Sequence, residues 1–206
     1  MKYLSPLFII LLLTGCTTIS YIPRVVLDVS PQIIHANVQI DKFVDKTSAR
    51  DKRKPIGGVN IADTRAMTGD LGLELTQVIT QDFKNNSVFS NVGRRVENAD
   101  YILKGEIVTF KGKFKPTALF WVTIPIHTVT LFSLPLHKED INVELKISVY
   151  KKSGELVKTY SATSSSHHYY SMYYKIEYAL PSDVNRCLSK AVEDIRTQLL
   201  ADAGKY

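Results

Sequence analysis

A twenty-residue pattern, "INVELKISVYKKSGELVKTY" at 141–160, constrains the fold more than any other part of the chain. Its first half alternates apolar and polar side chains, and successive side chains of a β-strand point to opposite faces of a sheet. The turn "KKSGE" contains a glycine, as hairpin turns commonly do. The pattern therefore predicts an antiparallel hairpin with one apolar face that another layer must cover. The apolar positions are Ile141, Val143, Leu145, Ile147 and Val149.

Shorter runs of the same kind predict the remaining strands. A first strand-like segment is "RVVLDV" at 24–29, and "NVQIDKFVD" at 37–45 alternates like a half-buried strand. The segment "PIGGVNIAD" at 55–63 carries paired glycines that suggest a bulge or a close backbone approach. A short strand at 88–92 and a long one at 99–112 follow.

Two helices are predicted from helical spacing. Asp70 caps the first, which runs to about Asn85 with apolar residues on one side. Ser182 is expected to cap the second, whose buried stripe includes Cys187. The order of elements predicts an α/β (α+β) fold, with a single mixed β-sheet and helices packed mainly on one face.

The opening "MKYLSPLFIILLLTGCTT" has the layout of a secretory signal. Lys2 gives a positive start, 7–13 are apolar, and small residues precede Cys16. The apolar run is too short to span a bilayer by itself. We expect a signal peptide at 1–15, a tether at 16–24 and one domain at 25–206.

The four residues "LTGC" resemble the lipobox of bacterial lipoproteins. That resemblance implies a diacylglyceryl group and an acyl chain such as palmitate on Cys16, after cleavage before it. Thr17 stands where an Asp would resemble the inner-membrane retention signal, so the outer membrane, facing the periplasm, is expected. The alternative is an uncleaved anchor or an ordinary signal with an incidental cysteine. No other cofactor is expected.

The second cysteine, Cys187, has no intramolecular disulfide partner once Cys16 carries lipid. Its place on an apolar helical stripe indicates a small buried residue. A reactive thiol or an intermolecular bridge is the alternative.

The chain has a net charge of +6, of which Lys2 contributes one unit. An export signal excludes nucleic acid as the partner and leaves lipid headgroups, lipopolysaccharide and cell-wall polymers as polyanions. The basic residues concentrate in one segment that is either an anion-binding site or a solvated loop: Arg50, Lys52, Arg53 and Lys54.

The apolar insertion at 116–137 contains "TALFWVTIPIHTVTLFSLPL", twenty residues without an acidic or basic side chain. Pro125 argues against a spanning helix, since it removes a backbone hydrogen bond. It also argues against two transmembrane strands, for which a turn signal is absent. The insertion is then either a loop or short helix pair that covers the core, or an exposed patch for membrane or partner. In the second case Phe120, Trp121 and Phe132 make the contact.

A tyrosine cluster follows in "HHYYSMYYKIEY". On a helix, Tyr170, Tyr174 and Tyr178 share one face, with Tyr173 adjacent. The face is interpreted as an amphipathic lid, a surface for a protein partner, or a platform for sugar stacking.

The sequence contains no motif for an enzyme or a metal site. His167 and His168 are adjacent, so on a strand they face opposite ways, and His127 and His137 lack neighbouring ligands at a suitable spacing. We therefore expect neither a catalytic residue nor a bound metal.

Residues 36–203 resemble small bacterial lipoproteins built on a TolB-amino-terminal-like α/β domain, such as LpoB, PelC and CsgG. The resemblance rests on the order of the segments quoted above and on "ADYILKGEI". It implies a non-enzymatic structural or assembly accessory of an envelope complex, often oligomeric, whose protein partners differ between members. The alternatives are a ring-forming secretion or export component with a membrane-inserting segment, and a module that binds an anionic polymer or glycan.

Overall fold

The computed structural model describes residues 19–25, 33–63, 69–123, 135–171 and 176–206. Within these residues one mixed sheet has the order β4-β1-β5-β6-β7, and the short strands β2 and β3 also pair with β5. The strands are β1 (Ile34–Ile40), β2 (Val44–Asp45), β3 (Val59–Asn60), β4 (Phe89–Gly93), β5 (Tyr101–Pro116), β6 (His137–Lys151) and β7 (Leu156–Tyr170). Pairs β1–β4, β1–β5 and β2–β5 are parallel, and the pairs of β5 with β3 and β6, and of β6 with β7, are antiparallel.

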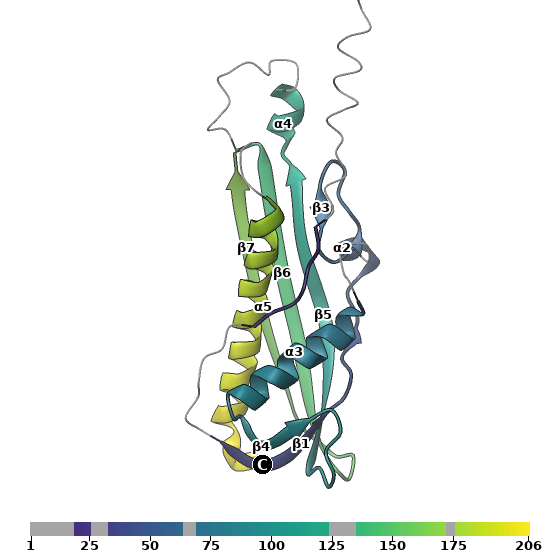
Figure 1. The fold of residues 1–206 in the computed structure, drawn as a ribbon, viewed down its shortest axis with the longest axis vertical. Coiled ribbons are helices and arrows are strands. Elements are labelled where there is room, and N and C mark those ends of the chain that lie inside the picture. Colours follow the sequence, from purple (N-terminus) through teal and green to yellow (C-terminus); the bar gives the residue numbers. More distant parts are fainter. Residues whose placement is uncertain (1–18, 26–32, 64–68, 124–134, 172–175) are drawn as a thin grey trace, which may run out of the picture.

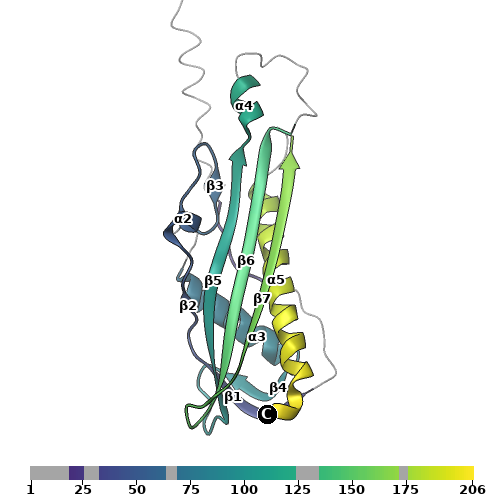
Figure 2. The same cartoon turned by 180° about the vertical axis from the view of Figure 1, so that it is seen from behind.

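The helices are α2 (Ala49–Lys52), α3 (Leu71–Asn85), α4 (Ala118–Thr123) and α5 (Ile176–Ala201), followed by the 3-10 turn η2 (Ala203–Lys205). Figures 1 and 2 show α3 and α5 on one face of the sheet and the other face open. The predicted fold class is confirmed.

The alternation of apolar and polar side chains along β6 explains why the helices cover only one face of the sheet. Ile141, Val143 and Leu145 are fully buried against the helices, while the residues between them are partly exposed on the open face. Val184, Leu188 and Val192 of α5 pack against this layer from the other side. Burial of each such side chain contributes about 1.5–3 kcal/mol, so the predicted hairpin becomes the centre of the core.

One position in β5 requires glycine, because the connection between β1 and β2 packs closely against the strand there. A Cβ atom on Gly105 would lie 2.2 Å from the ring of Phe43, which is itself buried. Gly105 thus leaves the space that an aromatic ring from the β1–β2 connection fills, which fixes that connection over the sheet.

Several element boundaries differ from the prediction. The strand predicted at 37–45 is divided into β1 and β2, and the one predicted at 55–63 is reduced to β3. Helix α3 and its cap Asp70 agree with the prediction, and Asp70 accepts a hydrogen bond from the Leu73 amide. The strand predicted at 24–29 lies mostly outside the described residues.

The predicted cap Ser182 is wrong, because α5 begins at Ile176 and contains Pro181. Proline lacks an amide hydrogen and removes one backbone bond near the helix start. The buried Leu180 and Val184 on either side pack into the core, which offsets that loss.

A buried ion pair joins the two helices of the covering layer. Arg196 of α5 donates through Nη1 to both carboxylate oxygens of Asp82 in α3, at 3.1 and 3.2 Å. The two side chains are 6% and 0% exposed. Burial raises the pKa of Asp82, and Arg196 and Asn86 oppose that shift.

Replacing Arg196 with Met should lower the free energy of unfolding by about 3–5 kcal/mol, because the Asp82 carboxylate is left buried without its cation. Urea denaturation measures this loss. Lys190→Met on the exposed side of α5 is the matched control and should cost less than about 0.5 kcal/mol. Equal stability of the two variants would contradict the proposed importance of the pair.

Candidate functional site

The apolar insertion leaves the sheet and returns to it at one point. The Thr117 amide donates to the Leu136 carbonyl at 2.8 Å, and the Thr117 hydroxyl donates to the Pro135 carbonyl at 3.1 Å. Between these residues the chain first forms α4, which extends beyond the end of the sheet (Figures 1 and 2). Residues 124–134, including Phe132 and His127, lie outside the described part.

Three exposed apolar side chains gather at this end, and we call them the apolar tip: Ile56, Leu119 and Trp121. Ile56 is 87% exposed, Trp121 50% and Leu119 37%. Gly57, with φ of 66°, lets the loop before β3 reach Trp121, since a Cβ atom there would lie 3.3 Å from the indole ring. A left-handed backbone of this kind favours glycine. The apolar tip thus combines two segments that are far apart in the sequence.

A stack of rings supports the tip from below. Phe120 is half-buried and meets Trp121 edge-to-face, with 5.4 Å between ring centroids. His137 lies 5.3 Å from Phe120 and stacks on Phe114 at 4.9 Å. Burial lowers the pKa of His137, which favours a neutral imidazole in this aromatic setting. Two of the predicted contact residues therefore have different roles. Trp121 faces outward, while Phe120 packs beneath it and fixes the position of the indole ring.

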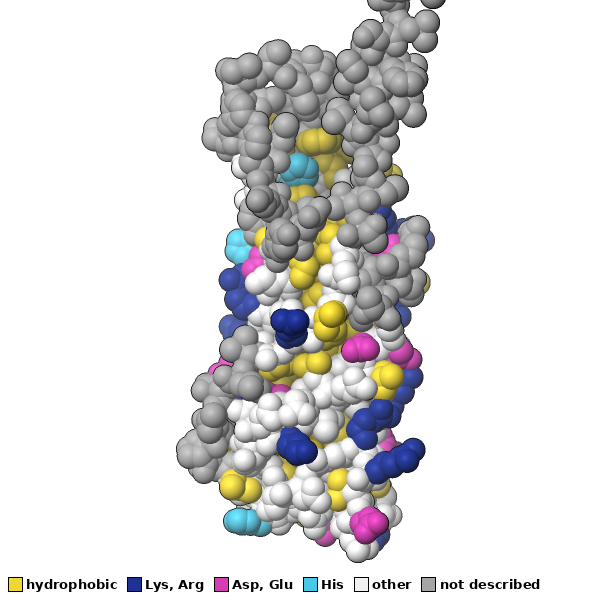
Figure 3. Space-filling model, viewed as in Figure 1, with side chains coloured by type: hydrophobic (Ala, Val, Ile, Leu, Met, Phe, Trp, Pro, Cys, Tyr) yellow, Lys and Arg dark blue, Asp and Glu magenta, His cyan; other side chains and the backbone are white. Residues whose placement is uncertain are grey.

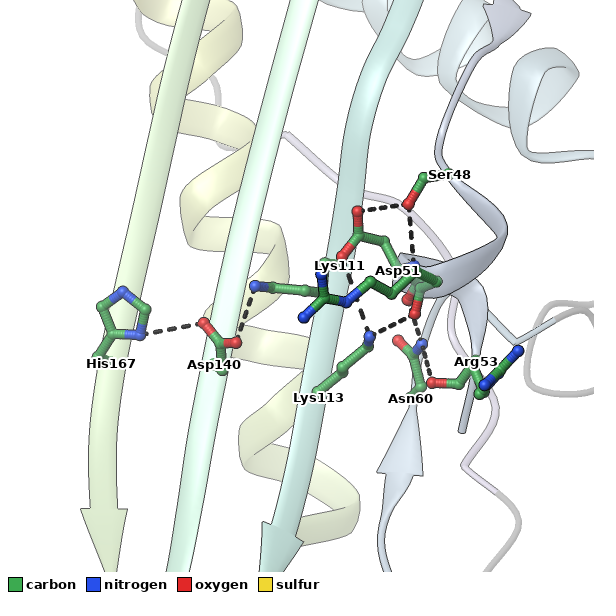
Figure 4. A network of polar contacts seen from close by, with 9 residues as sticks. Ser48, Asp51, Arg53, Asn60, Lys111, Lys113, Asp140 and His167 are labelled. Carbon is green, nitrogen blue, oxygen red and sulfur yellow. Dashed lines mark hydrogen bonds and ion pairs between the residues drawn. The ribbon is translucent and has the colours of Figure 1, made fainter. Parts of the chain in front are cut away.

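The basic loop around α2 lies beside the tip and is held by a polar network (Figure 4). Lys113 of β5 donates to the Arg50 carbonyl at 2.8 Å. The buried Asn60 side chain donates to the carbonyls of Asp51 and Arg53, at 2.6 and 3.2 Å. The backbone of this loop is thus fixed against the sheet, while the side chains of Arg50, Arg53 and Lys54 are exposed.

The four basic side chains that were interpreted as either an anion-binding site or a solvated loop differ in their contacts. Lys52 forms an ion pair with Asp45 at 2.6 Å. Arg50, Arg53 and Lys54 are exposed and make no ion pair with any described residue. Lys54 is two residues before Ile56, so cationic side chains border the apolar tip. In Figure 3 basic side chains lie along the flanks and also in the middle of this face, and hydrophobic ones form a band that runs down from the upper end.

The first described segment of the chain packs on β5 and α5, at a distance from the apolar tip. Tyr21 packs on Phe110 of β5 with ring centroids 5.8 Å apart, and its hydroxyl donates to Asn185 of α5 at 2.9 Å. In Figure 1 this segment begins at the level of β3 and runs toward the middle of α5. Cys16 itself lies outside the described residues, but the five residues from Tyr21 span at most roughly 18 Å.

The tyrosine cluster does not form the predicted helical face. Tyr170 is the last residue of β7, half-buried, and its hydroxyl donates to Glu139 at 2.7 Å. The neighbouring Tyr169 points to the open face and is 61% exposed. Tyr173, Tyr174 and the Tyr178 side chain lie outside the described part. The helix fails to include Tyr170 because β7 continues to pair with β6 up to His137.

The two adjacent histidines face opposite ways, as predicted. His167 lies 3.1 Å from Asp140 on the open face, where Asp140 also pairs with Lys111 (Figure 4). His168 lies 3.5 Å from Glu139 on the helix-covered face. Glu139 was not among the site residues predicted from the sequence, although it is in phase with the buried Ile141 and Val143. An acidic residue at a core position of a strand is the signal that would have drawn attention to it.

Cys187 is buried, as predicted. Burial raises the pKa of its thiol, which favours the neutral, less reactive form.

Replacing Asn60 with Ala should release the basic loop, because its amide joins Asp51 and Arg53 and its carbonyl oxygen accepts from the Ala62 amide. We expect a loss of about 1–3 kcal/mol in stability and faster amide hydrogen exchange at 50–54. The exposed Asn91→Ala is the control and should leave both unchanged. Unaltered exchange in the Asn60 variant would contradict this account of the loop.

Among the helices of the described residues, none combines the length and apolarity needed to cross a bilayer.

The chain matches no protein-family model and no curated protein sequence. Solved structures are similar to it at low identity. Protein XCC0632 from Xanthomonas campestris, of family DUF330, is 12% identical with a TM-score of 0.56, covering 90% of this chain and 95% of that one. A minor lipoprotein from Acinetobacter baumannii is 9% identical with a TM-score of 0.45, covering 83% and 95% of the two chains. The PelC dodecamer from Paraburkholderia phytofirmans is 11% identical with a TM-score of 0.33, covering 82% and 91%. The last two scores are low, so the similarity of fold rests on the Xanthomonas protein.

Proposed function

We propose that this protein is an outer-membrane lipoprotein, anchored through Cys16 and facing the periplasm. In this role it is a non-enzymatic structural or assembly component of an envelope complex. The observation that carries the proposal is the apolar tip, with its basic border, at one end of the molecule. The first described segment, which follows Cys16 in the sequence, begins at the level of β3, within reach of that end.

Distances along the chain support this arrangement. Tyr21 packs on Phe110, which lies six residues before the end of β5, or about 20 Å along the strand. The tether from Tyr21 to Cys16 has a similar maximum reach, roughly 18 Å. An extended tether therefore brings Cys16 close to the end of β5, from which α4 extends, and the lipid chains on Cys16 and the apolar tip would meet the same bilayer.

The chemistry of the tip suits a headgroup region. An indole ring has an apolar body and a polar N–H group, and tryptophan is enriched at this depth in membrane proteins. Basic residues near an anionic surface add about 1 kcal/mol each. Arg53 and Lys54 border the tip, so they would contact phosphate groups while Ile56 and Trp121 enter the acyl boundary.

The proposed kinship with TolB-amino-terminal-like lipoproteins rests on the order of elements, and the assembly role follows from that kinship. With the tip at the membrane, the long strands extend away from the bilayer and present the open face of the sheet to the periplasm. That face carries charged side chains of β5 and β6, such as Lys104 and Lys146, which suit a polar protein partner.

The ring-forming alternative requires strands across the bilayer from 117–136. The first part of this stretch is the helix α4, which does not favour such strands. Among the described residues, the exposed Arg50, Arg53 and Lys54 and the exposed Tyr169 are the features that agree with the polymer-binding alternative.

Trp121 is the only tryptophan in the chain, so its fluorescence reports on the tip alone. Full-length lipoprotein is reconstituted into vesicles that contain lipids with a spin label high on the acyl chain. We expect the label to quench Trp121 emission by more than about half relative to unlabelled vesicles, because the ring lies at the headgroup boundary.

The matched control moves the reporter to the far end of the sheet. In the double variant Trp121→Phe and Tyr150→Trp, the indole sits on β6 close to the β6–β7 turn, and its emission should not respond to the labelled lipid. Equal quenching at both positions, or none at Trp121, would rule out the proposed orientation.

A further inference from the structure

Three side chains that can bind a metal ion converge on the helix-covered side of the sheet, near its α4 end. They are Glu139 of β6, His168 of β7 and Asp183 of α5, and their ligand atoms lie within 4.8 Å of one another. The residues are far apart in the sequence, and the strand register and the helix packing bring them together. The cluster is separate from the apolar tip.

Glu139 is the buried member, with 0% of its surface exposed. Its Oε2 atom accepts a hydrogen bond from the Tyr170 hydroxyl at 2.7 Å, but its Oε1 atom has no partner among the described residues. A buried carboxylate oxygen without a partner is costly. Burial accordingly raises the pKa of Glu139, and the nearby Asp183 adds to that shift.

The contacts around the cluster leave negative charge unbalanced. The Tyr170 oxygen lies 2.7 Å from Glu139 Oε2 and 3.3 Å from Asp183 Oδ2, yet a phenol has one hydrogen to donate. Asp183 is compensated on its outer side, where its Oδ1 atom lies 2.8 Å from Nη2 of the exposed Arg186. The inner oxygens of both carboxylates therefore share one phenolic hydrogen, and a cation beside them would be stabilised.

We propose that Glu139, His168 and Asp183 form a binding site for a divalent transition metal, zinc being the best match. Zinc accepts one imidazole nitrogen and two carboxylate oxygens, and a water molecule completes four-fold coordination. Two ligands on one tetrahedral zinc ion lie about 3.4 Å apart, given bond lengths of about 2.0–2.1 Å. His168 Nδ1 and Glu139 Oε2 lie 3.5 Å apart, so a small movement brings both onto one ion.

Neighbouring groups already orient the ligands. The hydroxyl of Tyr170 holds Glu139, and the guanidinium of Arg186 holds Asp183. Such outer partners fix ligand geometry and strengthen metal binding. The bound ion would join the first turns of α5 to the ends of β6 and β7, and so stabilise the part of the sheet from which the insertion extends.

Zinc binding to the full-length protein in detergent tests the proposal, with competition against a chromophoric chelator as the readout. We expect one zinc ion per chain and binding at least about tenfold weaker in each of three variants, Glu139→Gln, His168→Gln and Asp183→Asn. His167→Gln is the matched control. Its side chain is the next residue on the same strand, but it points to the open face and should leave affinity unchanged.

Thermal unfolding gives a second readout that does not depend on the buried glutamate variant being folded. Zinc should raise the Tm of the wild type and of His167→Gln by the same amount, and should raise that of His168→Gln clearly less at the same zinc concentration. The His168 side chain is 45% exposed, so this variant is expected to fold. Absence of stoichiometric zinc binding in the wild type would overturn the proposal, as would wild-type affinity in both His168→Gln and Asp183→Asn.

Discussion

The rest of the structure depends on one constraint, the alternation of buried and exposed side chains along three long antiparallel strands. β5, β6 and β7 contain 16, 15 and 15 residues, and each turns its buried positions toward the helix-covered face, where α5 packs on them. A shift of one residue in any pairing would move that strand's apolar set to the open face. Apart from one register shift in each of the two long pairs, between Ile107 and Thr109 and between Val149 and Tyr150, the pairing is continuous up to the ends where the chemically distinctive residues lie.

Both sites follow from this register. At the end of the β5–β6 pair, Pro116 lies opposite His137, so the insertion begins and ends at paired strands. In the β6–β7 pair, Glu139 and His168 are cross-strand partners on the covered side, and Asp140 and His167 are the next pair on the open side. The alternation of buried and exposed side chains thus places Glu139 and His168 on the covered face, and the Asp140–His167 ion pair, one residue away on each strand, on the open face.

The sequence predicted most of this fold because its periodic segments are long. The β6–β7 hairpin, α3 with its Asp70 cap and the buried Cys187 follow from local patterns alone. Other features depend on tertiary contacts. The chain bends between β1 and β2 because the Phe43 ring packs over Gly105. Helix α5 begins before Pro181 because Leu180 is buried in the core. The convergence of Ile56 with Trp121, and of Asp183 with Glu139, joins distant segments and has no local signature.

The central claim is that lipid on Cys16 and the apolar tip hold the same end of the molecule at a bilayer. Intact-mass spectrometry of the protein extracted from membranes of its native producer tests the first part directly. The account predicts a chain that has lost residues 1–15 and carries a diacylglyceryl group and an acyl chain on Cys16. An unmodified thiol at Cys16 with the leader still attached would contradict it.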